Sequence, residues 1–301
     1  MKHGPRVCVV GSINMDLVTT TKKIPTQGET VLGEKFETYP GGKGANQAIA
    51  AARLGADVTM IGAVGDDAFG ADLLKHFESE SIRSEGLQVI PDMSTGIATI
   101  ILSEHDNRII VAAGANQMVT PKVVESAQDI LLSSDMILVQ FETPLETVKY
   151  TVEFASKHDI PVIVNPAPFQ EMPKEILEKA AYITPNELEY AGISSMAHVD
   201  VSKDKMIITK GDQGVAYTDA AGEAQLIPAY SVHVKDTTGA GDTFNGALAT
   251  ELASGKTLAE AIDFANAAAA LSVQAIGAQG GMPTREAVID FINENMRRKL
   301  T

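Results

Sequence analysis

Short runs of apolar, mostly β-branched residues recur along this chain, and most are followed by a stretch with helical spacing. The strand candidates are Val7–Val10, Val58–Ile61, Met136–Phe141, Pro161–Val164, Tyr182–Thr184 and Met206–Thr209. The helix candidates are Ala45–Leu54, Leu145–Lys157, Ile176–Lys179, Thr243–Ser254, Leu258–Ala275 and Thr284–Arg298. Buried strands that alternate with helices are typical of βαβ units. The pattern predicts an α/β fold with a mostly parallel central sheet, covered by helices on both faces.

Two segments interrupt this alternation. Leu17–Tyr39 and Thr95–Ala112 are rich in Thr, Val and Ile, and Glu104–Asn107 reads as a hairpin turn within the second. We predict a small accessory sheet, with strands from roughly residues 14–40 and 95–112, that could cover a site as a lid. The alternative is that these are ordinary edge strands of the main sheet. Because no long linker divides the chain, we expect one α/β domain over residues 1–301.

The charge balance limits the partners of the chain. It has 24 Lys and Arg against 39 Asp and Glu, a net charge of −15, which argues against nucleic-acid and anionic-membrane partners. It lacks the apolar run of about 18 residues that a membrane-spanning helix needs. The run Val7–Val10 is too short for the core of a signal peptide, and the only cysteine, Cys8, cannot form an intramolecular disulfide. We therefore expect a cytoplasmic protein.

Polar residues follow five of the predicted strands directly. In an open parallel sheet, ligands bind beyond the carboxyl ends of the strands. The residues at these ends are Asn14 and Asp16, Glu142, Asn165, Asn186 and Glu189, and the Lys210–Gly214 segment. Each alone could be a turn or a helix cap, but together they predict a crevice lined with hydrogen-bond donors and carboxylates.

A first glycine cluster, Gly41–Asn46, precedes the alanine-rich helix. Its backbone can approach a ligand closely, while Lys43 and Asn46 supply a charge and an amide. This lining would suit a polyhydroxylated sugar. A glycine-rich turn that packs the helix against the sheet is the alternative, but it does not explain the lysine and the asparagine.

A second cluster, Asp236–Phe244, stands at the start of a predicted helix. Small residues there leave N–H groups free, and the helix dipole favours negative charge, so Gly239–Asp242 predicts an anion hole for a phosphoryl group. We expect the ionised form of Asp242 to be stabilised there, which would make it a weak base. The alternative role of Asp242 is an ordinary N-cap. The chain has neither a Walker A loop nor G-x-G-x-x-G after its first strand.

These two clusters, in this order and roughly 200 residues apart, resemble the paired signatures of the ribokinase (PfkB) family of sugar and nucleoside kinases. The first matches at Gly41, Gly42, Gly44, Asn46 and Ala48, with Gly55 and Gly65 following; the second matches across Asp236–Gly246. Gly11–Asp16, Thr184–Glu189 and Phe264–Leu271 are similar to segments of the ribokinase branch. The resemblance covers essentially the whole chain. It implies a ribokinase-like three-layer α/β/α sandwich with a small β-sheet lid.

The resemblance also implies a reaction, the transfer of the γ-phosphoryl group of ATP to O5 of D-ribose. Asp242 would accept the hydroxyl proton, beside an anion hole made by Gly239, Ala240 and Gly241. The implied sugar-binding residues are Asn14, Met15, Asp16, Gly42, Lys43, Gly44, Ala45, Asn46, Glu142 and Asp242. The implied nucleotide-binding residues are Asn186, Thr209, Lys210, Gly211, Asp212, Gln213, Gly214, Gly241, Asp242 and Asn266.

Two cations and a dimer are further implications of the resemblance. Asn186 and Glu189 would help to position Mg²⁺ or another divalent cation, largely through water. An activating K⁺ would be held by Asp236, Thr238, Ser272, Ala275, Gly277 and Gly281. Ribokinases often have a serine where this chain has Gly281, and Asp236 could instead be the partner of an Asx turn. A homodimer that pairs through the lid is also implied.

Other functions remain open at this point. A kinase of the same family could act on fructose, 2-keto-3-deoxygluconate, deoxyribose or a nucleoside. A non-catalytic sugar-binding protein on this fold is a further alternative, because a fold alone does not assign a function. A nicotinamide-dependent oxidoreductase is disfavoured by the missing dinucleotide fingerprint.

Overall fold

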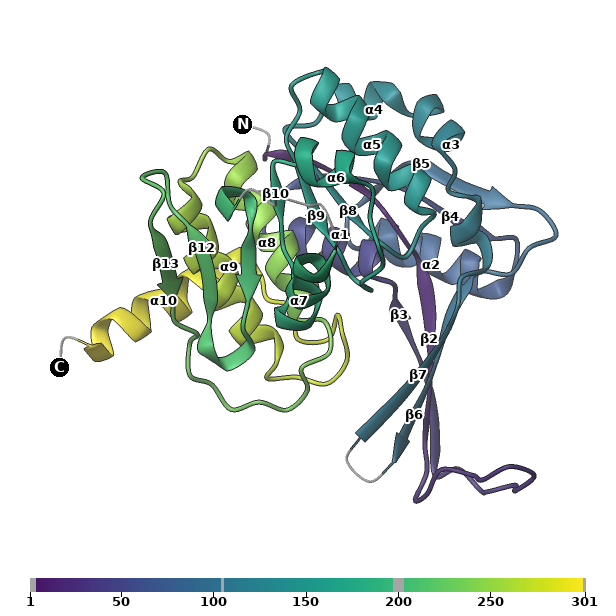
Figure 1. Cartoon of the computed structure of the whole chain (residues 1–301). Coiled ribbons are helices and arrows are strands. Elements are labelled where there is room, and N and C mark those ends of the chain that lie inside the picture. The colour runs from purple at the N-terminus through teal and green to yellow at the C-terminus, as the bar shows by residue number, and fades with distance from the viewer. Residues whose placement is uncertain (1–3, 104–105, 197–202, 300–301) are drawn as a thin grey trace.

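The computed structural model describes residues 4–103, 106–196 and 203–299, so Glu104 and His105 of the predicted turn lie outside the described residues (Figure 1). Its main sheet has the strand order β10-β9-β8-β1-β4-β5, and every neighbouring pair is parallel. The strands are β1 (Arg6–Val10), β4 (Asp57–Gly65), β5 (Arg83–Ile90), β8 (Met136–Gln140), β9 (Val162–Asn165) and β10 (Tyr182–Ile183). The predicted parallel α/β fold is confirmed.

Strand β1 shows why both faces of this sheet need a covering layer. Its side chains alternate, with Val7 and Val9 in one buried cluster and Cys8 and Val10 in the other. The first cluster includes residues of α1 (Lys43–Arg53), α2 (Ala68–Ser79), α8 (Ala240–Ala253), α9 (Leu258–Ser272) and α10 (Arg285–Lys299). The second includes residues of α3 (Pro121–Ser126), α4 (Gln128–Leu132), α5 (Leu145–Lys157), α6 (Lys174–Lys179) and α7 (Glu187–Ser195). The result is the expected sandwich of three layers.

Helix α9 ends at Ser272, three residues earlier than the predicted helix Leu258–Ala275. The carbonyl of Val273 accepts hydrogen bonds from the backbone N–H groups of Lys235 and Asp236, at 2.8 and 3.2 Å. These bonds tie the end of the helix to the segment that precedes α8. A contact between segments that are distant in sequence therefore stops the helix, and the apolar pattern could not show it.

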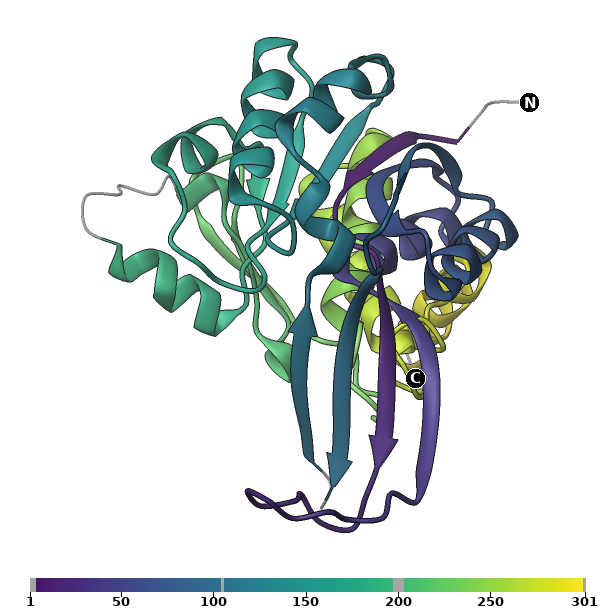
Figure 2. The same cartoon turned by 90° about the vertical axis from the view of Figure 1, so that its right-hand side faces the viewer.

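A second, four-stranded sheet projects away from the layered body, and Figure 2 shows its strands side by side. We call it the outer sheet; its order is β3-β2-β6-β7, and its strands are β2 (Asn14–Thr20), β3 (Lys35–Gly41), β6 (Gly96–Ser103) and β7 (Asp106–Ala112). Only β2 and β6 pair in parallel. The predicted small accessory sheet is thus present, and the alternative of edge strands on the main sheet is wrong. The number of domains stays a prediction.

The predicted strand Met206–Thr209 belongs elsewhere than expected. Strand β11 (Ile207–Thr209) pairs antiparallel with β12 (Val215–Thr218), which pairs with β13 (Ala224–Ile227) in a three-stranded sheet. Isolated parallel bridges join Met206 to Ile183 and Thr209 to Asn186. Its assignment to the main sheet was therefore wrong, although its end still lies beside the end of β10. The residues that the structure describes also form three short 3₁₀ helices, η1 (Gly114–Met118), η2 (Lys203–Lys205) and η3 (Gly211–Gln213).

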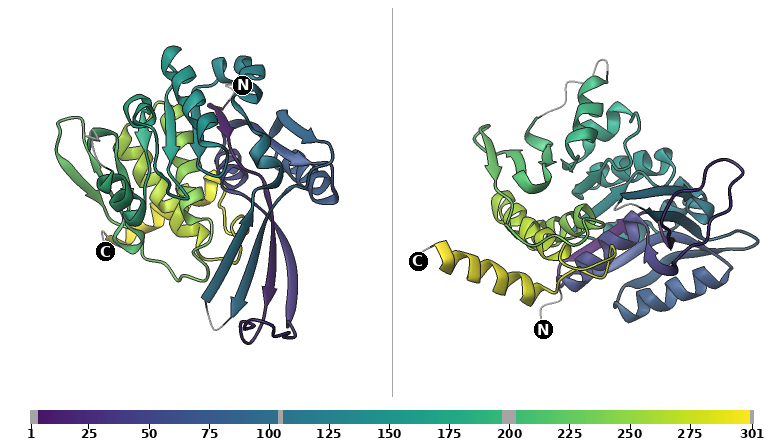
Figure 3. Two further views of the ribbon diagram at one scale, coloured as in Figure 1. Left: turned by 45° about the vertical axis from the view of Figure 1, so that its right-hand side comes forward. Right: turned by 90° about the horizontal axis from the view of Figure 1, so that it is seen from below.

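The strand order of the main sheet reverses direction between β1 and β8. From β1 the chain moves outward to β4 and β5, and then returns to β8 on the other side of β1 before continuing to β9 and β10. In open α/β sheets such a reversal opens a crevice at the carboxyl ends of the strands. In both views of Figure 3 the outer sheet and α10 extend from different sides of the layered body. Within the described part of the chain, no helix combines the length and apolarity needed to cross a membrane.

Candidate active site

A cavity of about 150 Å³ lies among the ends of β9, β10 and β11 and the starts of α1, α7 and α8. It brings together seven of the residues that the sequence analysis proposed, which are Lys43, Asn186, Glu189, Thr209, Gly239, Gly241 and Asp242. Asn165 also lines it, as a polar residue at the end of its strand. Ala167, Thr184 and Asn245, which were not predicted as site residues, complete the lining.

The start of α8 presents unpaired N–H groups to this cavity. Gly239 is the N-cap, and its φ of 79° lies in the left-handed region that favours glycine. The N–H of Ala240 is bonded to the carbonyl of Thr237 at 3.2 Å, and that of Thr243 to Gly239 at 2.8 Å. The N–H groups of Gly241 and Asp242 have no hydrogen-bond partner among the described residues, as expected in the first turn of a helix. Gly241 and Asp242 can therefore donate to an anion, whereas the N–H of Ala240, which was also expected in the anion hole, is already engaged.

Asp242 does not cap its helix. It is the third helical residue, and its carboxylate points back to α1, where Oδ2 accepts from Nδ2 of Asn46 and Oδ1 from Nε2 of Gln47, both at 2.9 Å. The alternative role as an N-cap is therefore wrong. Gln47 was missed, because a glutamine within an alanine-rich helix carries no signal of its own. Its position directly after Asn46 was the only hint.

Burial is the largest influence on the pKa of Asp242, and it raises that pKa above the ordinary value. The positive charge of Lys43 and the two amide donors oppose this effect, while the charge of Glu142 adds to it. The expected stabilisation of the ionised form is therefore outweighed in the ligand-free protein. A raised pKa makes Asp242 a stronger base than the sequence analysis expected.

The other proposed polar residues lie around Lys43, the first residue of α1. Its backbone N–H donates to Oε2 of Glu142 at 3.0 Å, and the hydroxyl of Ser12 donates to the same oxygen at 2.6 Å. Burial would lower the pKa of Lys43, but nearby carboxylates outweigh it and raise the pKa. These carboxylates belong to Asp242, Glu142, Glu189 and Asp16. The single positive charge of Lys43 therefore lies near four negatively charged groups.

Asp16 is the acidic group that this imbalance affects most clearly. Burial, followed by the charges of Glu142 and Asp242, raises the pKa of Asp16 to about 7, against the opposing charge of Lys43. Asp16 lies on β2 of the outer sheet, so the base of that sheet contributes directly to the charge of the site. Met15 is buried beside it.

Asn14 starts β2 and is fixed by a residue that the sequence analysis did not propose. Asn116 in η1 exchanges hydrogen bonds with the backbone of Ile13, at 2.8 and 3.1 Å, and donates from Nδ2 to Oδ1 of Asn14 at 2.8 Å. The amide nitrogen of Asn14 is thereby left to donate to a ligand. In the neighbouring cluster Gly42 is the N-cap of α1, and Gly44 and Ala45 are buried in its first turn.

Asn186 and Glu189 form a capping box at the start of α7. The side chain of each accepts from the backbone N–H of the other at 2.8 Å. Burial raises the pKa of Glu189, and the N–H of Asn186 and the charge of Lys43 oppose it. The box uses Oε2, while Oε1 of Glu189 makes no hydrogen bond within the described residues. An oxygen ligand is therefore available for a hydrated divalent cation.

The remaining proposed nucleotide residues form the outer rim of the site. Gly211, Asp212 and Gln213 are exposed in η3. Nζ of Lys210 lies 3.7 Å from Oε1 of Glu187 in α7. Asn266 is buried in α9 and donates to the carbonyl of Pro228 at 2.9 Å. None of these residues lines the cavity described above.

The proposed potassium ligands meet between the start of α8 and the segment after α9. Asp236 accepts from the N–H of Thr238 at 2.9 Å and from that of Gly277 at 2.8 Å, so it is the partner of an Asx turn as well as a link between the two segments. Burial would raise the pKa of Asp236, but these N–H groups outweigh it and lower the pKa. The ionised carboxylate and the nearby carbonyls are oxygen ligands that suit a hard cation.

The backbone around Gly281 explains why this chain has a glycine where ribokinases often have a serine. A Cβ at this position would lie 1.9 Å from the carbonyl oxygen of Ser272, so a serine does not fit this backbone. The carbonyl oxygen of Ser272 stands where that side chain would be. Its hydroxyl is engaged elsewhere, donating to the carbonyl of Ala269 at 2.8 Å.

Comparisons with known proteins agree with this geometry. The model of the pfkB family of carbohydrate kinases matches residues 5–285. The ribokinase of Bacillus subtilis is 46% identical over 291 residues, covering 95% of this chain and 99% of that protein. The ribokinase of Lactococcus lactis is 44% identical, covering 92% of this chain and 94% of its own.

A solved structure of ribokinase from Arabidopsis thaliana, complexed with ribose and ATP, superposes with a TM-score of 0.89 at 28% identity. It covers 96% of this chain and 99% of that one. Because the family model matches most of this chain and the relatives are similar over nearly their whole length, the chain belongs to the pfkB family of carbohydrate kinases.

Proposed function

We propose that this protein is a ribokinase, which transfers the γ-phosphoryl group of ATP to O5 of D-ribose. The observation that carries the proposal is the start of α8, where the buried carboxylate of Asp242 lies beside the unpaired N–H groups of Gly241 and Asp242. A proton acceptor and an anion hole are thus placed at one helix terminus. The similarity to ribokinases over most of the chain supports the choice of substrate.

The reaction needs positioning and charge stabilisation more than a strong base, because the transition state of phosphoryl transfer is loose. Asp242 takes the proton of the attacking hydroxyl as the O–P bond forms, and ADP leaves with the former β–γ bridging oxygen. The N–H groups and dipole of α8 stabilise the charge on the transferred group, and Lys43 adds a positive charge nearby. The outer sheet, closing over the sugar, would keep water from competing as the acceptor.

The sugar would lie beside the start of β2, the start of α1 and the end of β8. Asn14, Asp16 and Glu142 would accept or donate hydrogen bonds to the ring hydroxyls, and Asn46, which donates to Asp242, would lie beside the attacking hydroxyl. Gly42, Lys43, Gly44 and Ala45 would form the floor at the start of α1. A polyol recognised by several polar groups is discriminated strongly from an analogue that lacks one hydroxyl.

The nucleotide would lie across the outer rim, along Thr209–Gly214 and near Asn266, with its phosphates at α8. Mg²⁺, when bound, would neutralise phosphate charge, and Glu189 with Asn186 would hold its water ligands. K⁺ would be held by Asp236 and the carbonyls of the segment after α9. Because the Asp236–Thr238 turn directly precedes the start of α8, a K⁺ held there would help to fix the shape of the anion hole.

A test of the substrate is a panel that measures ADP release with MgATP and D-ribose, fructose, 2-deoxyribose or adenosine. We expect kcat/KM to be highest for ribose, by at least about tenfold. A preference for another sugar would contradict the ribokinase assignment but not the family. Binding of ribose without any ADP release would favour a sugar-binding protein without kinase activity.

We also propose a homodimer that pairs through the outer sheet, and a cytoplasmic location. The dimer is supported by Ile109, Ile110 and Val111 on the edge strand β7, each more than half exposed. The location is supported by Cys8, which is completely buried as a thiol and needs no oxidising compartment.

A further inference from the structure

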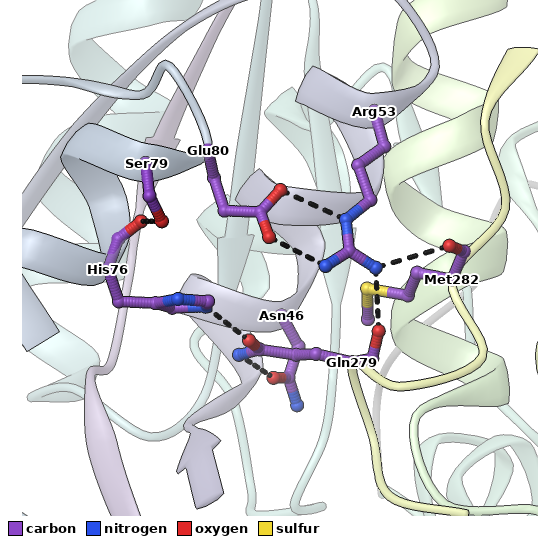
Figure 4. Close-up of polar contacts among 7 residues, drawn as sticks. All are labelled: Asn46, Arg53, His76, Ser79, Glu80, Gln279 and Met282. Carbon is purple, nitrogen blue, oxygen red and sulfur yellow. Dashed lines mark hydrogen bonds and ion pairs between the residues drawn. The ribbon is translucent and has the colours of Figure 1, made fainter. Parts of the chain in front are cut away.

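Gln279, in the segment between α9 and α10, contacts the site although no part of the mechanism above uses it. Its side chain is buried, and Nε2 donates to Oδ1 of Asn46 at 2.8 Å (Figure 4). Asn46 in turn donates from Nδ2 to Oδ2 of Asp242 at 2.9 Å. One amide therefore separates Gln279 from the proposed proton acceptor.

The hydrogen bonds in this series share one direction. An amide has a donating and an accepting end, and its orientation is decided by its partners. Oε1 of Gln279 accepts from Nε2 of His76 at 2.8 Å, which makes Nε2 the protonated ring nitrogen. With Oε1 occupied as an acceptor, Nε2 of Gln279 faces Asn46. The donors then run in one direction, from His76 through Gln279 and Asn46 to Asp242.

The backbone of Gln279 is held as firmly as its side chain. Arg53 of α1 donates from Nη1 to the carbonyls of Gln279 and Met282, at 2.7 and 3.2 Å. Glu80, just after α2, accepts two hydrogen bonds from the same guanidinium, at 2.6 and 3.0 Å. The carbonyl of Gln279 is thus fixed by Arg53 of α1, which Glu80 holds in place from the end of α2.

A purely structural link between α1 and the segment after α9 would account for the hydrogen bonds of Arg53 and Glu80. It would not require a donor to Oδ1 of Asn46. The other oxygen of Asp242 shows the same arrangement, because Gln47 accepts on Oε1 from Nε2 of Gln140 at 2.6 Å and donates from Nε2 to Asp242. Each amide that contacts the carboxylate therefore has a glutamine behind it.

We infer that Gln279 is a positioning residue that orients the amide of Asn46, so that its N–H₂ group faces the carboxylate of Asp242. The inference rests on the proposed function for the role of Asp242. Without Gln279, only Asp242 itself favours this orientation, so the amide of Asn46 turns more readily and can present its oxygen to the carboxylate. That turn would remove one donor and place two acceptors against each other.

The charged groups around Asp242 make this loss measurable. Lys43 and the amide donors hold its pKa down, whereas burial and Glu142 raise it, and Asp16 and Glu189 add further negative charge nearby. Losing a hydrogen bond to the ionised form raises the pKa of Asp242 further. The defect should therefore be large at low pH and shrink as the pH rises.

The test uses Gln279→Met, which keeps the length of the side chain without polar atoms, and Gln279→Glu, which accepts but does not donate when ionised. Gln274→Met, on a partly exposed glutamine of the same segment, is the matched control. We expect both Gln279 variants to lower kcat by up to about tenfold at the acidic end of its pH profile and by much less at the alkaline end. The control should keep the wild-type profile.

A second measurement does not depend on turnover. The ¹³Cγ titration of Asp242, assigned by comparison with Asp242→Asn, should have a higher midpoint in Gln279→Met than in the wild type. An equal loss of kcat at every pH with an unchanged midpoint would show that Gln279 is only a structural link. If the wild-type protein phosphorylates no sugar, the proposed function fails, and the titration still decides the inference about Gln279.

Discussion

Asp242 is the residue on which the proposed mechanism depends most directly. Asp242→Asn keeps its size but removes the proton acceptor, and its N–H₂ group must face one of the donors Asn46 and Gln47. We expect kcat to fall by at least about a hundredfold, the usual scale for loss of a positioned base. Ribose binding, measured by calorimetry, should change little.

Asp290→Asn, on the exposed side of α10, is the matched control for this substitution. It makes the same chemical change far from the site and should leave kcat unaltered. An Asp242→Asn variant that turns over at the wild-type rate would remove Asp242 from its proposed role.

Asp16 gives the site a pH dependence near neutrality. Its pKa of about 7 in the folded protein lies above the ordinary value, chiefly because of burial. Between these two pKa values the folded state binds more protons than the unfolded state, so the contribution of Asp16 to stability falls as the pH rises towards 7. We expect Asp16→Asn to stabilise the ligand-free protein more at pH 8 than at pH 5, measured by denaturant unfolding.

The same titration affects sugar binding, because only the ionised carboxylate accepts two hydroxyl donors. The KM for ribose should fall between pH 6 and pH 8 in the wild type and stay flat, at a higher value, in Asp16→Asn. A KM that does not vary with pH in the wild type would contradict the raised pKa.

At the scale of elements, helices α7 and α9 begin with the same capping box, yet only one of them faces the cavity. Glu189→Gln and Glu260→Gln each keep an oxygen for the box, since glutamine also serves at that position. Glu189→Gln removes the carboxylate proposed to hold the water ligands of Mg²⁺. We expect its apparent requirement for Mg²⁺ to rise about tenfold, whereas Glu260→Gln leaves it unchanged.

The melting temperatures of these two variants separate the structural from the functional role. Both should lie close to that of the wild type, because both retain the helix start. A large drop for Glu189→Gln alone, with an unaltered Mg²⁺ requirement, would mean that the box is its whole function.

The elements that the sequence predicts well are those whose signal is local. The continuous apolar run Val7–Val10 predicted the buried strand β1, and Gly239–Asp242 predicted the start of α8. Met206–Thr209 was assigned to the wrong sheet, because an apolar run does not say which strand it pairs with. Long-range pairing is decided by the whole chain and cannot be read from one segment.

The same limit explains which site residues were missed. Gln47 and Gln279 act on Asp242 or on its partner across sequence separations of 195 and 233 residues. A glutamine makes the same hydrogen bonds in a core, a turn or a site, so its type indicates no role. The glycines and acidic residues of the site were predicted because their chemistry restricts the positions at which they occur.

At the scale of the whole molecule, the outer sheet has an exposed apolar strand at its edge. Strand β7 is at its edge, and Ile109, Ile110 and Val111 are 52%, 67% and 51% exposed. These side chains lie on both faces of the strand, since they alternate along it. An exposed apolar edge strand can pair with the strand of another chain. In a purified protein, that chain is a second copy of the same protein.

We therefore expect light scattering after gel filtration to give the mass of a dimer for the wild type, and that of a monomer for Ile110→Lys. Ile289→Lys, at an isoleucine of α10 that is 43% exposed, places the same charge on another surface and should leave the dimer intact. Because β2 of the same sheet carries Asn14 and Asp16, the monomer should also bind ribose more weakly. Its phosphoryl-transfer activity should be retained, because the start of α8 does not belong to this sheet. A dimer that survives Ile110→Lys would place the dimer interface on another surface. A wild type that is monomeric at every concentration would contradict the proposed dimer.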